Sequence, residues 1–154
     1  MEDIRRLSRR LIAASSAADG AYYQWAKRAH ITWHTLDLLY VLDDGLPHSQ
    51  KQICEQWGFP KTTINTAVKA CQAAGYITLE AMEGQPRQRQ ICLTEAGRAY
   101  ARRALGTICA AEDQAMAEAA ARFGPQFVEA AEFFFAQFRA AIGAALSEEE
   151  NNPV

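Results

Sequence analysis

Two groups of residues in the middle of this 154-residue chain could contact a polyanion. The first lies on residues 61–74, where Ile64, Val68 and Cys71 recur three and four apart, so that a helix would bury them on one face. Asparagine can pair with adenine, threonine can reach a base or a phosphate, and lysine suits phosphates. An ordinary solvated helix face has a similar composition, so the face alone leaves both interpretations open. The polar face of this predicted helix consists of Lys61, Thr62, Thr63, Asn65, Thr66 and Lys69.

Arg87 and Arg89 form the second group. They follow a glycine and a proline in the stretch MEGQPRQRQ, residues 82–90, which separates two short apolar runs. Glycine and proline predict a turn, and this turn would place both arginines at the tip of a hairpin formed by residues 76–82 and 91–94. Two like charges with no acidic residue between them are either merely solvated or contact phosphates and a minor groove.

A short helix is predicted just before residues 61–74. Ser49 and Gln52 have the spacing of a capping box, and Gly58 is placed to end the helix. Ser49 and Gln50, at the start of this helix, could also donate hydrogen bonds to a phosphate. Two short helices joined by WGFPK and followed by a charged hairpin are typical of a winged helix-turn-helix, in which the second helix enters the major groove.

Helical periodicity also extends over both ends of the chain. Thr32 is placed to cap a helix that ends before DDGLP, and Thr94 to cap an alanine-rich helix that ends near Arg122. The fold class is therefore predicted to be mainly α with a small β-hairpin wing, a winged helix-turn-helix with long terminal helices. Near each end of the chain, apolar residues recur three and four positions apart and so form a stripe along the predicted helix. The N-terminal apolar stripe consists of Ile4, Leu7, Leu11, Ala14, Ala18, Ala21 and Trp25. The C-terminal stripe consists of Phe127, Ala131, Phe134, Phe135, Phe138, Ile142 and Leu146.

The two stripes carry more apolar surface than a small winged-helix core needs. We expect a second copy of the chain to cover them, and the alternative is that they pack on each other within one chain. The predicted organisation is a single structural domain with four segments. These are an N-terminal dimerisation helix (1–30), a winged helix-turn-helix DNA-binding lobe (31–100), C-terminal dimerisation helices (101–147) and a frayed acidic tail (148–154).

Charge is segregated along the chain, although the formal net charge is only −2. Residues 1–44 are balanced, residues 45–106 hold eight basic and four acidic residues, and residues 107–154 hold two basic and eight acidic residues. A modestly acidic protein can thus present a basic middle to nucleic acid. Because no apolar run reaches the roughly 20 residues that span a bilayer and the N-terminus lacks the pattern of a secretory signal, we expect a cytoplasmic protein with no membrane contact.

Residues suited to catalysis or metal binding do not form a recognised pattern. The motifs GxSxG and HExxH and a glycine-rich phosphate loop are absent from the sequence. The four cysteines, Cys54, Cys71, Cys92 and Cys109, have no CxxC spacing or nearby histidine pair. They are expected to be small buried hydrophobes, with a redox switch as the alternative. We therefore predict no enzyme activity, no cofactor and no metal.

The stretch SQKQICEQWGFPKTTINTAVKACQAAGYI, followed by RQICLTEAG, resembles the winged-helix region of MarR-type transcriptional regulators. The most specific part is the L-T-x-x-G element at residues 93–97, supported by GYI at residues 75–77. The motifs cover about residues 31–100, and the order of helices covers the whole chain. The family's wing usually carries Asp-x-Arg, whereas this chain has QPR at residues 85–87, which keeps the arginine and lacks its acidic brace.

The resemblance implies a homodimer, formed by the first and the last two helices, that binds a pseudo-palindromic operator on double-stranded DNA, most often as a repressor. Lys61 to Lys69 would enter the major groove and Arg87 the flanking minor groove. An alternative is a protein-interaction module, an antagonist or adaptor, that has kept the fold and lost operator binding.

The resemblance also implies a small effector, often aromatic or anionic, that binds between the dimer region and the DNA-binding lobe. The corresponding place in this chain is the junction of the first two helices, where these side chains could equally belong to the core or the surface. The junction is rich in aromatic and histidine residues, namely Tyr22, Tyr23, Trp25, His30, Trp33 and His34.

Overall fold

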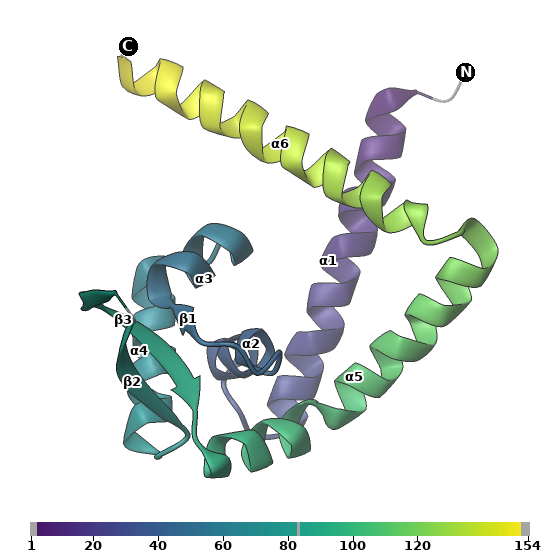
Figure 1. Ribbon diagram of the computed structural model, residues 1–154. Coiled ribbons are helices and arrows are strands. Elements are labelled where there is room, and N and C mark those ends of the chain that lie inside the picture. The colour runs from purple at the N-terminus through teal and green to yellow at the C-terminus, as the bar shows by residue number, and fades with distance from the viewer. Residues whose placement is uncertain (1–2, 83, 152–154) are drawn as a thin grey trace. The chain divides into compact units, whose positions relative to one another are not determined.

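The computed structural model describes residues 3–82 and 84–151. The chain forms two compact units, residues 1–109 and residues 110–154. The second unit holds the end of α5 and all of α6 (Gln126–Asn151). The first unit holds α1 (Ile4–Arg28), α2 (Trp33–Leu42), β1 (His48–Ser49), α3 (Gln50–Trp57), α4 (Lys61–Ala73), β2 (Ile77–Met82), β3 (Gln85–Leu93) and the larger part of α5 (Glu95–Phe123) (Figure 1).

The helices of the winged-helix lobe, residues 31–100, begin where their capping residues predict. At the start of α2, Thr32 Oγ1 accepts the backbone N–H of Thr35 at 3.2 Å. At the start of α3, Ser49 Oγ accepts from the Gln52 N–H at 3.1 Å, and Gln52 Oε1 accepts from the Ser49 N–H at 2.8 Å. Each bond satisfies a backbone N–H that the first helical turn leaves without a partner. The predicted capping box is therefore confirmed.

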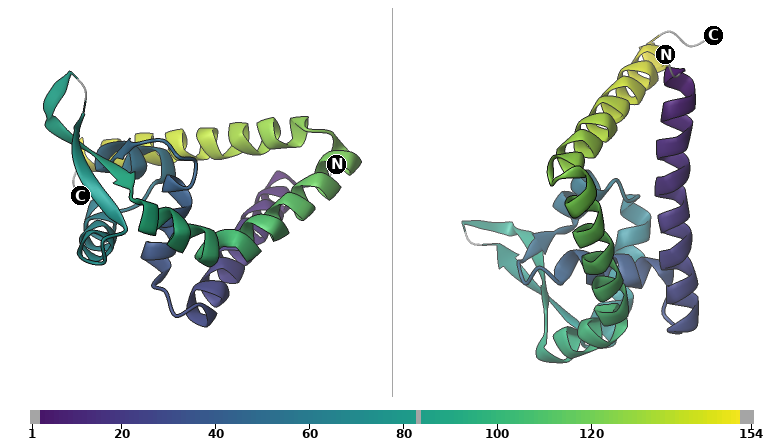
Figure 2. Two further views of the ribbon diagram at one scale, coloured as in Figure 1. Left: turned by 60° about the horizontal axis from the view of Figure 1, so that its bottom comes forward. Right: turned by 90° about the vertical axis from the view of Figure 1, so that its right-hand side faces the viewer.

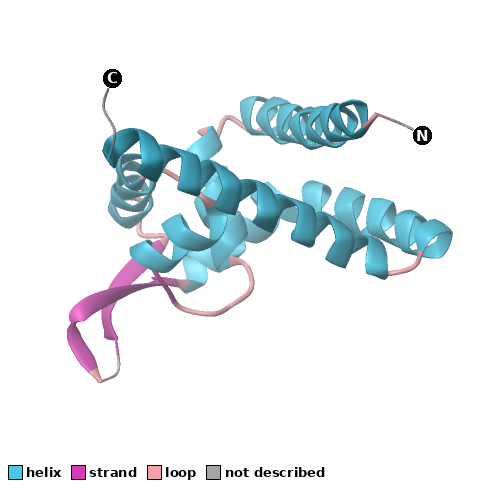
Figure 3. Ribbon diagram, turned by 90° about the horizontal axis from the view of Figure 1, so that it is seen from above, coloured by secondary structure: helices cyan, strands magenta, loops and turns pink. Residues whose placement is uncertain are grey.

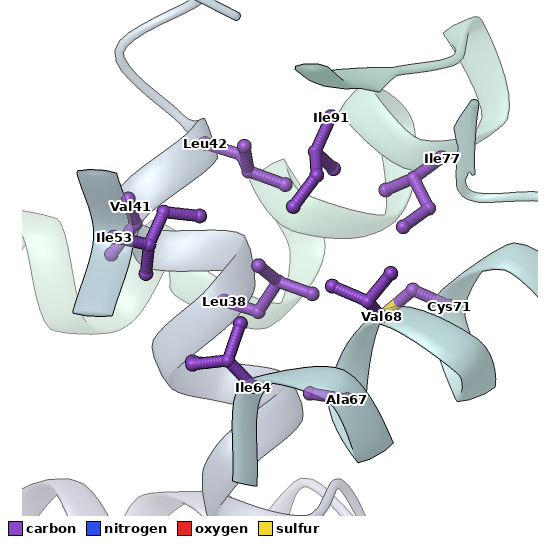
Figure 4. Packing of buried hydrophobic residues seen from close by; sticks show 10 residues of the cluster. All are labelled: Leu38, Val41, Leu42, Ile53, Ile64, Ala67, Val68, Cys71, Ile77 and Ile91. Atoms are coloured by element: carbon purple, nitrogen blue, oxygen red, sulfur yellow. The ribbon is translucent and has the colours of Figure 1, made fainter. Parts of the chain in front are cut away.

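The core of this lobe lies between α2, α3, α4 and the sheet, as Figure 4 shows. The predicted apolar face of α4 is confirmed, since Ile64, Val68 and Cys71 are almost completely buried. Burial raises the pKa of the Cys71 thiol to about 11, so this cysteine is an unreactive core residue. The cluster consists of Leu38, Val41, Leu42, Ile53, Ile64, Ala67, Val68, Cys71, Ile77 and Ile91.

A second apolar cluster joins α1 and α2 to the first half of α5. The Trp25 indole Nε1 donates a hydrogen bond of 2.7 Å to the carbonyl oxygen of Ala104 and so ties α1 to α5. This contact is long-range in sequence and gives Trp25 a structural role. The buried members are Ala26, Ile31, Leu36, Leu39, Ala101, Ala104, Leu105 and Ile108.

The L-T-x-x-G element fastens the base of the hairpin to α5. Thr94 N donates to Tyr76 O at 3.0 Å, Thr94 Oγ1 donates to Gly75 O at 2.7 Å, and Gly97 N donates to Thr94 Oγ1 at 3.0 Å. A Cβ at position 97 would overlap the Tyr76 carbonyl oxygen, so this close approach requires glycine. The rings of Tyr76 and Tyr100 stack with centroids 4.2 Å apart. The motif therefore positions the wing.

The hairpin differs from its prediction. β3 begins at Gln85, so the predicted placement of Arg87 and Arg89 at the tip is wrong, and both lie within the strand. Arg89 pairs with Ala81, but the next pair joins Met82 to Gln85, so residues 86–88 form a bulge. The chain turns at Gly84, whose φ of 74° favours glycine. β2 and β3 project outward from the helices of the first unit (Figure 2 and Figure 3).

The sheet also contains a strand that the sequence did not predict. β1 has only two residues, and it pairs antiparallel with β3 through His48 with Ile91 and Ser49 with Gln90. The strand order is β1-β3-β2. Two residues show no periodicity, so β1 is defined only by its partner. It holds the start of α3 beside the wing.

The second unit exposes part of its apolar stripe, namely Phe138, Ile142 and Leu146, and half-buries the rest. Among the α6 side chains that the structure describes, none is buried, and Phe133 is 68% exposed. Phe134 stacks on Phe138 with ring centroids 6.5 Å apart and meets Phe135 edge-on at 5.2 Å. α6 continues to Asn151, into the range predicted as a frayed tail, and residues 152–154 lie outside the described residues. No described helix is both long and apolar enough to cross a bilayer.

Candidate functional sites

The exposed face of α4 is the first candidate site. Because the apolar face of α4 is anchored in the core, the side chains opposite to it are presented outward. Thr66 Oγ1 donates to Thr62 O at 3.0 Å, which commits one hydroxyl proton to the helix. Lys61, Thr62, Asn65, Thr66 and Lys69 are exposed, and Thr63 is half-buried.

A groove of about 530 Å³ runs between α4, the start of α3 and the wing. We call it the basic groove, because Lys51, Lys61, Lys69 and Arg89 line it and the described lining residues include no carboxylate. The remaining lining residues are Ser49, Gln50, Asn65, Val68, Gln72, Leu79, Gln88 and Ile91.

The basic groove brings together part of the predicted DNA-binding set and adds to it. Thr62, Thr63, Thr66 and Arg87 do not line the groove. The sequence reasoning missed Lys51, Gln72 and Gln88. Helical spacing could have identified Gln72, which follows Lys69 by three residues and Asn65 by seven. Nothing in the sequence pointed to Gln88, because its segment was interpreted as a turn.

Ser49 has a structural role that competes with phosphate binding. Its side chain is buried and its Oγ accepts the Gln52 N–H at the start of α3. In contrast, Pro60 at the start of α4 provides no side-chain cap. The unpaired N–H groups of the first turn of α4 are therefore positioned for an anion, as at other helix N-termini.

The fold brings together only some of the predicted effector residues, since Tyr22, Trp25 and Trp33 pack against the second apolar cluster whereas His30 and His34 are exposed. Trp25 is bonded to α5, and His30 is exposed beyond the end of α1 with a φ of 54°. His34 is also exposed at the surface. Tyr22 and Trp33 of the predicted set line a cavity next to this cluster. The proposed effector set of Tyr22, Trp25, His30, Trp33 and His34 therefore remains a prediction, of which two residues line this cavity.

The cavity itself measures about 300 Å³ and lies within the first unit. We call it the aromatic pocket. The Tyr22 ring meets Trp33 and Tyr40 edge-on at 6.2 Å, Tyr40 meets Trp57 edge-on at 5.8 Å, and Trp57 stacks on Phe59 at 6.2 Å. Its lining residues are Asp19, Tyr22, Trp33, Leu36, Asp37, Tyr40, Trp57 and Phe59.

Asp37 is the most perturbed charge in this pocket. Its side chain is only 13% exposed, and its Oδ2 atom is buried with no hydrogen-bond partner among the described residues. Burial raises the pKa of Asp37 to about 6, nearby His34 opposes the rise, and the charge of Asp19 adds to it. His34 Nδ1 lies 3.8 Å from Oδ2, beyond hydrogen-bond distance. The pocket thus contains a poorly solvated carboxylate.

The order of elements, the basic groove and the wing define a winged helix-turn-helix protein. Residues 31–88 match the sequence profile of the MarR family. No curated protein has a matching sequence. The match is thus confined to the winged-helix lobe, and the whole chain has the fold of solved MarR family transcriptional regulators, which are not enzymes.

Solved structures with this fold are similar over almost the whole chain. NMB1585, a MarR family regulator from Neisseria meningitidis, is 21% identical, with a TM-score of 0.70 over 97% of this chain and 99% of that one. The transcriptional regulator BldR from Sulfolobus solfataricus is 13% identical, with a TM-score of 0.69 over 89% and 99%. BpsR from Bordetella bronchiseptica, whose DNA binding is regulated by 6-hydroxynicotinic acid, is 14% identical, with a TM-score of 0.59 over 90% and 94%.

Proposed function

We propose that this protein is a homodimeric, sequence-specific transcriptional regulator, a ligand-responsive repressor that binds a pseudo-palindromic operator in the cytoplasm. The observation that carries the proposal is the basic groove, in which the polar face of α4 and Arg89 of the wing meet without a lining carboxylate among the described residues. Clustered cations attract the DNA backbone, and the polar face between them can reach base edges.

The side chains divide by chemistry into two roles. Lys61, Lys69 and Lys51 are suited to phosphates and so would supply affinity that depends on salt. Asn65 and Gln72 are amides that can pair with a base edge, so they would supply sequence preference. The further members of the proposed DNA-contacting set are Gln50, Thr62, Thr63 and Thr66, with Arg87 and Arg89 of the wing.

A dimer is supported by apolar residues that a single chain leaves exposed. Ile4 on α1 is 79% exposed, and Phe138, Ile142 and Leu146 on α6 are each about half exposed. Terminal helices with exposed apolar stripes are suited to association with a second copy. Two copies of α4 would then read two half-sites about one helical turn of DNA apart.

Selection of bound fragments from random duplex DNA tests the proposal. We expect an enriched inverted repeat. Lys69→Ala should weaken binding to all sequences, whereas Asn65→Ala should relax the preference at one base position in each half-site. Lys27→Ala, on the exposed end of α1, is the matched control and should leave binding unchanged.

Loss of enrichment even at low salt would contradict the proposal. It would favour the protein-interaction module, for which the missing acidic brace in the wing is the supporting observation. Failure of both Lys69→Ala and Asn65→Ala to alter binding would remove α4 as the reading helix.

We place the effector in the aromatic pocket. The regulation of BpsR by a small molecule supports a ligand response in this fold. The pocket borders Trp57 and Phe59, and Phe59 directly precedes Pro60, where α4 begins. A ligand that prefers one arrangement of this segment would change operator affinity through that difference in binding.

A further inference from the structure

We propose that the aromatic pocket binds a small organic cation, with an apolar or aromatic body among the rings and an ammonium group facing the carboxylates of Asp19 and Asp37. Binding itself is independent of the proposed DNA-binding function, and only its effect on operator affinity rests on that function.

The charges of the pocket are the first argument. Asp19 on α1 and Asp37 on α2 both line the pocket, and no lysine or arginine appears among the described lining residues. The His34 side chain lies beside Asp37, but half of it is exposed and its Nδ1 is 3.8 Å from Asp37 Oδ2. A carboxylate held in a largely buried site, with only a half-exposed histidine 3.8 Å away, favours a ligand that supplies a cation.

The unsatisfied oxygen of Asp37 is the second argument. Asp37 Oδ2 is buried without a hydrogen-bond partner in the described part of the chain. Buried polar atoms normally have partners, and unpaired ones often occur at functional sites. Because Oδ2 itself is covered, a ligand would not bond to it directly. A positive charge in the cavity, which Asp37 lines, would instead offset the charge of the whole carboxylate.

The aromatic walls are the third argument. Tyr22, Trp33, Tyr40, Trp57 and Phe59 all line the same cavity. The face of each ring carries partial negative charge and attracts a cation, most strongly on tryptophan. The same rings provide apolar area for the body of the ligand. The aromatic rings and the two carboxylates therefore both favour a positively charged ligand.

Of the aromatic or anionic effector that the resemblance implies, this pocket favours the aromatic character over the negative charge. An anion in this pocket would face two carboxylates and the negative faces of the rings, with no lining cation among the described residues to offset the repulsion. The volume of about 300 Å³ is near the lower limit for ligand pockets, so the ligand is small.

Isothermal titration of the full chain with three ligands that share a phenylethyl body tests the proposal. Phenethylamine is a cation at pH 7.5, 2-phenylethanol is neutral and 3-phenylpropanoate is an anion. We expect phenethylammonium to bind at least about tenfold more tightly than the alcohol, and the propanoate to bind more weakly than both.

Two variants assign the preference to the carboxylates. Asp37→Asn and Asp19→Asn should each reduce the ratio of cation to alcohol affinity several-fold, and the double variant should abolish it. Asp113→Asn, on an exposed part of α5, is the matched control and should leave the ratio unchanged. Circular dichroism would verify that each variant is folded.

Three results would overturn the proposal. They are equal affinity for cation and alcohol, tighter binding of the propanoate, and no heat from any ligand up to about 10 mM. A preference that survives the double variant would also reject the carboxylates as its source. Because these titrations contain no DNA, failure of operator binding would leave their result intact. A cation that binds without changing operator affinity would remove only the regulatory role.

Discussion

The basic groove and the aromatic pocket lie in the same unit and carry opposite charge. Lysine and arginine line the groove, whereas aspartate lines the pocket. Lys61 of the groove and Phe59 of the pocket are separated only by Pro60, where α4 begins. The net charge of −2 therefore conceals two local environments of opposite charge. Charge at the scale of a site, rather than of the chain, indicates what this protein binds.

The largest expected effect on this contrast comes from charge reversal in the basic groove. The double variant Lys61→Glu, Lys69→Glu should lower operator affinity about 100- to 1,000-fold, because two attractive phosphate contacts become repulsive. Affinity of the aromatic pocket for phenethylammonium should stay the same. Fluorescence anisotropy and calorimetry measure the two. Lys27→Glu is the control, and an equally large loss there would show that the groove is not the specific contact.

The salt dependence of ligand affinity should also differ between the two sites, by a smaller factor than charge reversal produces. Between 50 and 200 mM salt, operator affinity should fall by roughly 100-fold or more, because several phosphate contacts release counterions. Cation binding in the partly enclosed pocket should fall by less than about threefold. Titrations of both ligands at each salt concentration measure the slopes. Equal slopes would mean that the pocket is as open to solvent as the groove.

The pocket should also lower the stability of the empty protein. The pKa of Asp37 is raised to about 6 from 3.8, so its ionised form destabilises the folded state above pH 6. This penalty fades as pH falls through 6 and is absent below 3.8. Asp37→Asn should therefore raise the free energy of unfolding by about 1–2 kcal/mol at pH 7.5, allowing for partial solvent screening.

Urea denaturation at pH 7.5 and pH 4 measures this difference. The stabilisation should be largely lost at pH 4, whereas the control Asp113→Asn should show no change at either pH. A constant effect at both pH values would mean that packing of the amide, rather than the carboxylate charge, is responsible.

The smallest expected effect distinguishes the two wing arginines. Arg89 lines the groove and pairs in register with Ala81, whereas Arg87 lies in the bulge outside the groove. Arg89→Ala should therefore reduce operator affinity about 3- to 10-fold more than Arg87→Ala does. Anisotropy titrations measure this ratio. A larger effect of Arg87→Ala would favour its placement in a flanking minor groove.

The L-T-x-x-G element shows why a motif can be recognised before its physical cause is known. The sequence identified Thr94 as a cap, which the Gly97 N–H confirms. It did not indicate why position 97 is glycine. That reason is the carbonyl oxygen of Tyr76, which comes from the other side of the hairpin.

Features that depend on neighbouring residues could be predicted from the sequence. The capping box at Ser49 and Gln52, the cap at Thr32 and the buried face of α4 follow from short-range hydrogen bonds and from helical periodicity. The order of helices and the winged-helix lobe could be predicted from these caps and from the helical periodicity. The basic groove was partly predictable, because four of its nine polar lining residues lie on α4 and share one helix face.

Features that need partners far apart in the chain could not be predicted in this way. β1 is defined by its pairing with Gln90 and Ile91 of β3. Because β3 begins at Gln85, earlier than predicted, Arg87 and Arg89 lie within the strand and not at the expected tip. The lining of the aromatic pocket comes from α1, α2, the end of α3 and the residue Phe59 that follows it. Aspartates and rings from two helices thus share one cavity with a ring from a third. Strand register and cavity lining are set by long-range packing, for which a local pattern of residue types carries no signal.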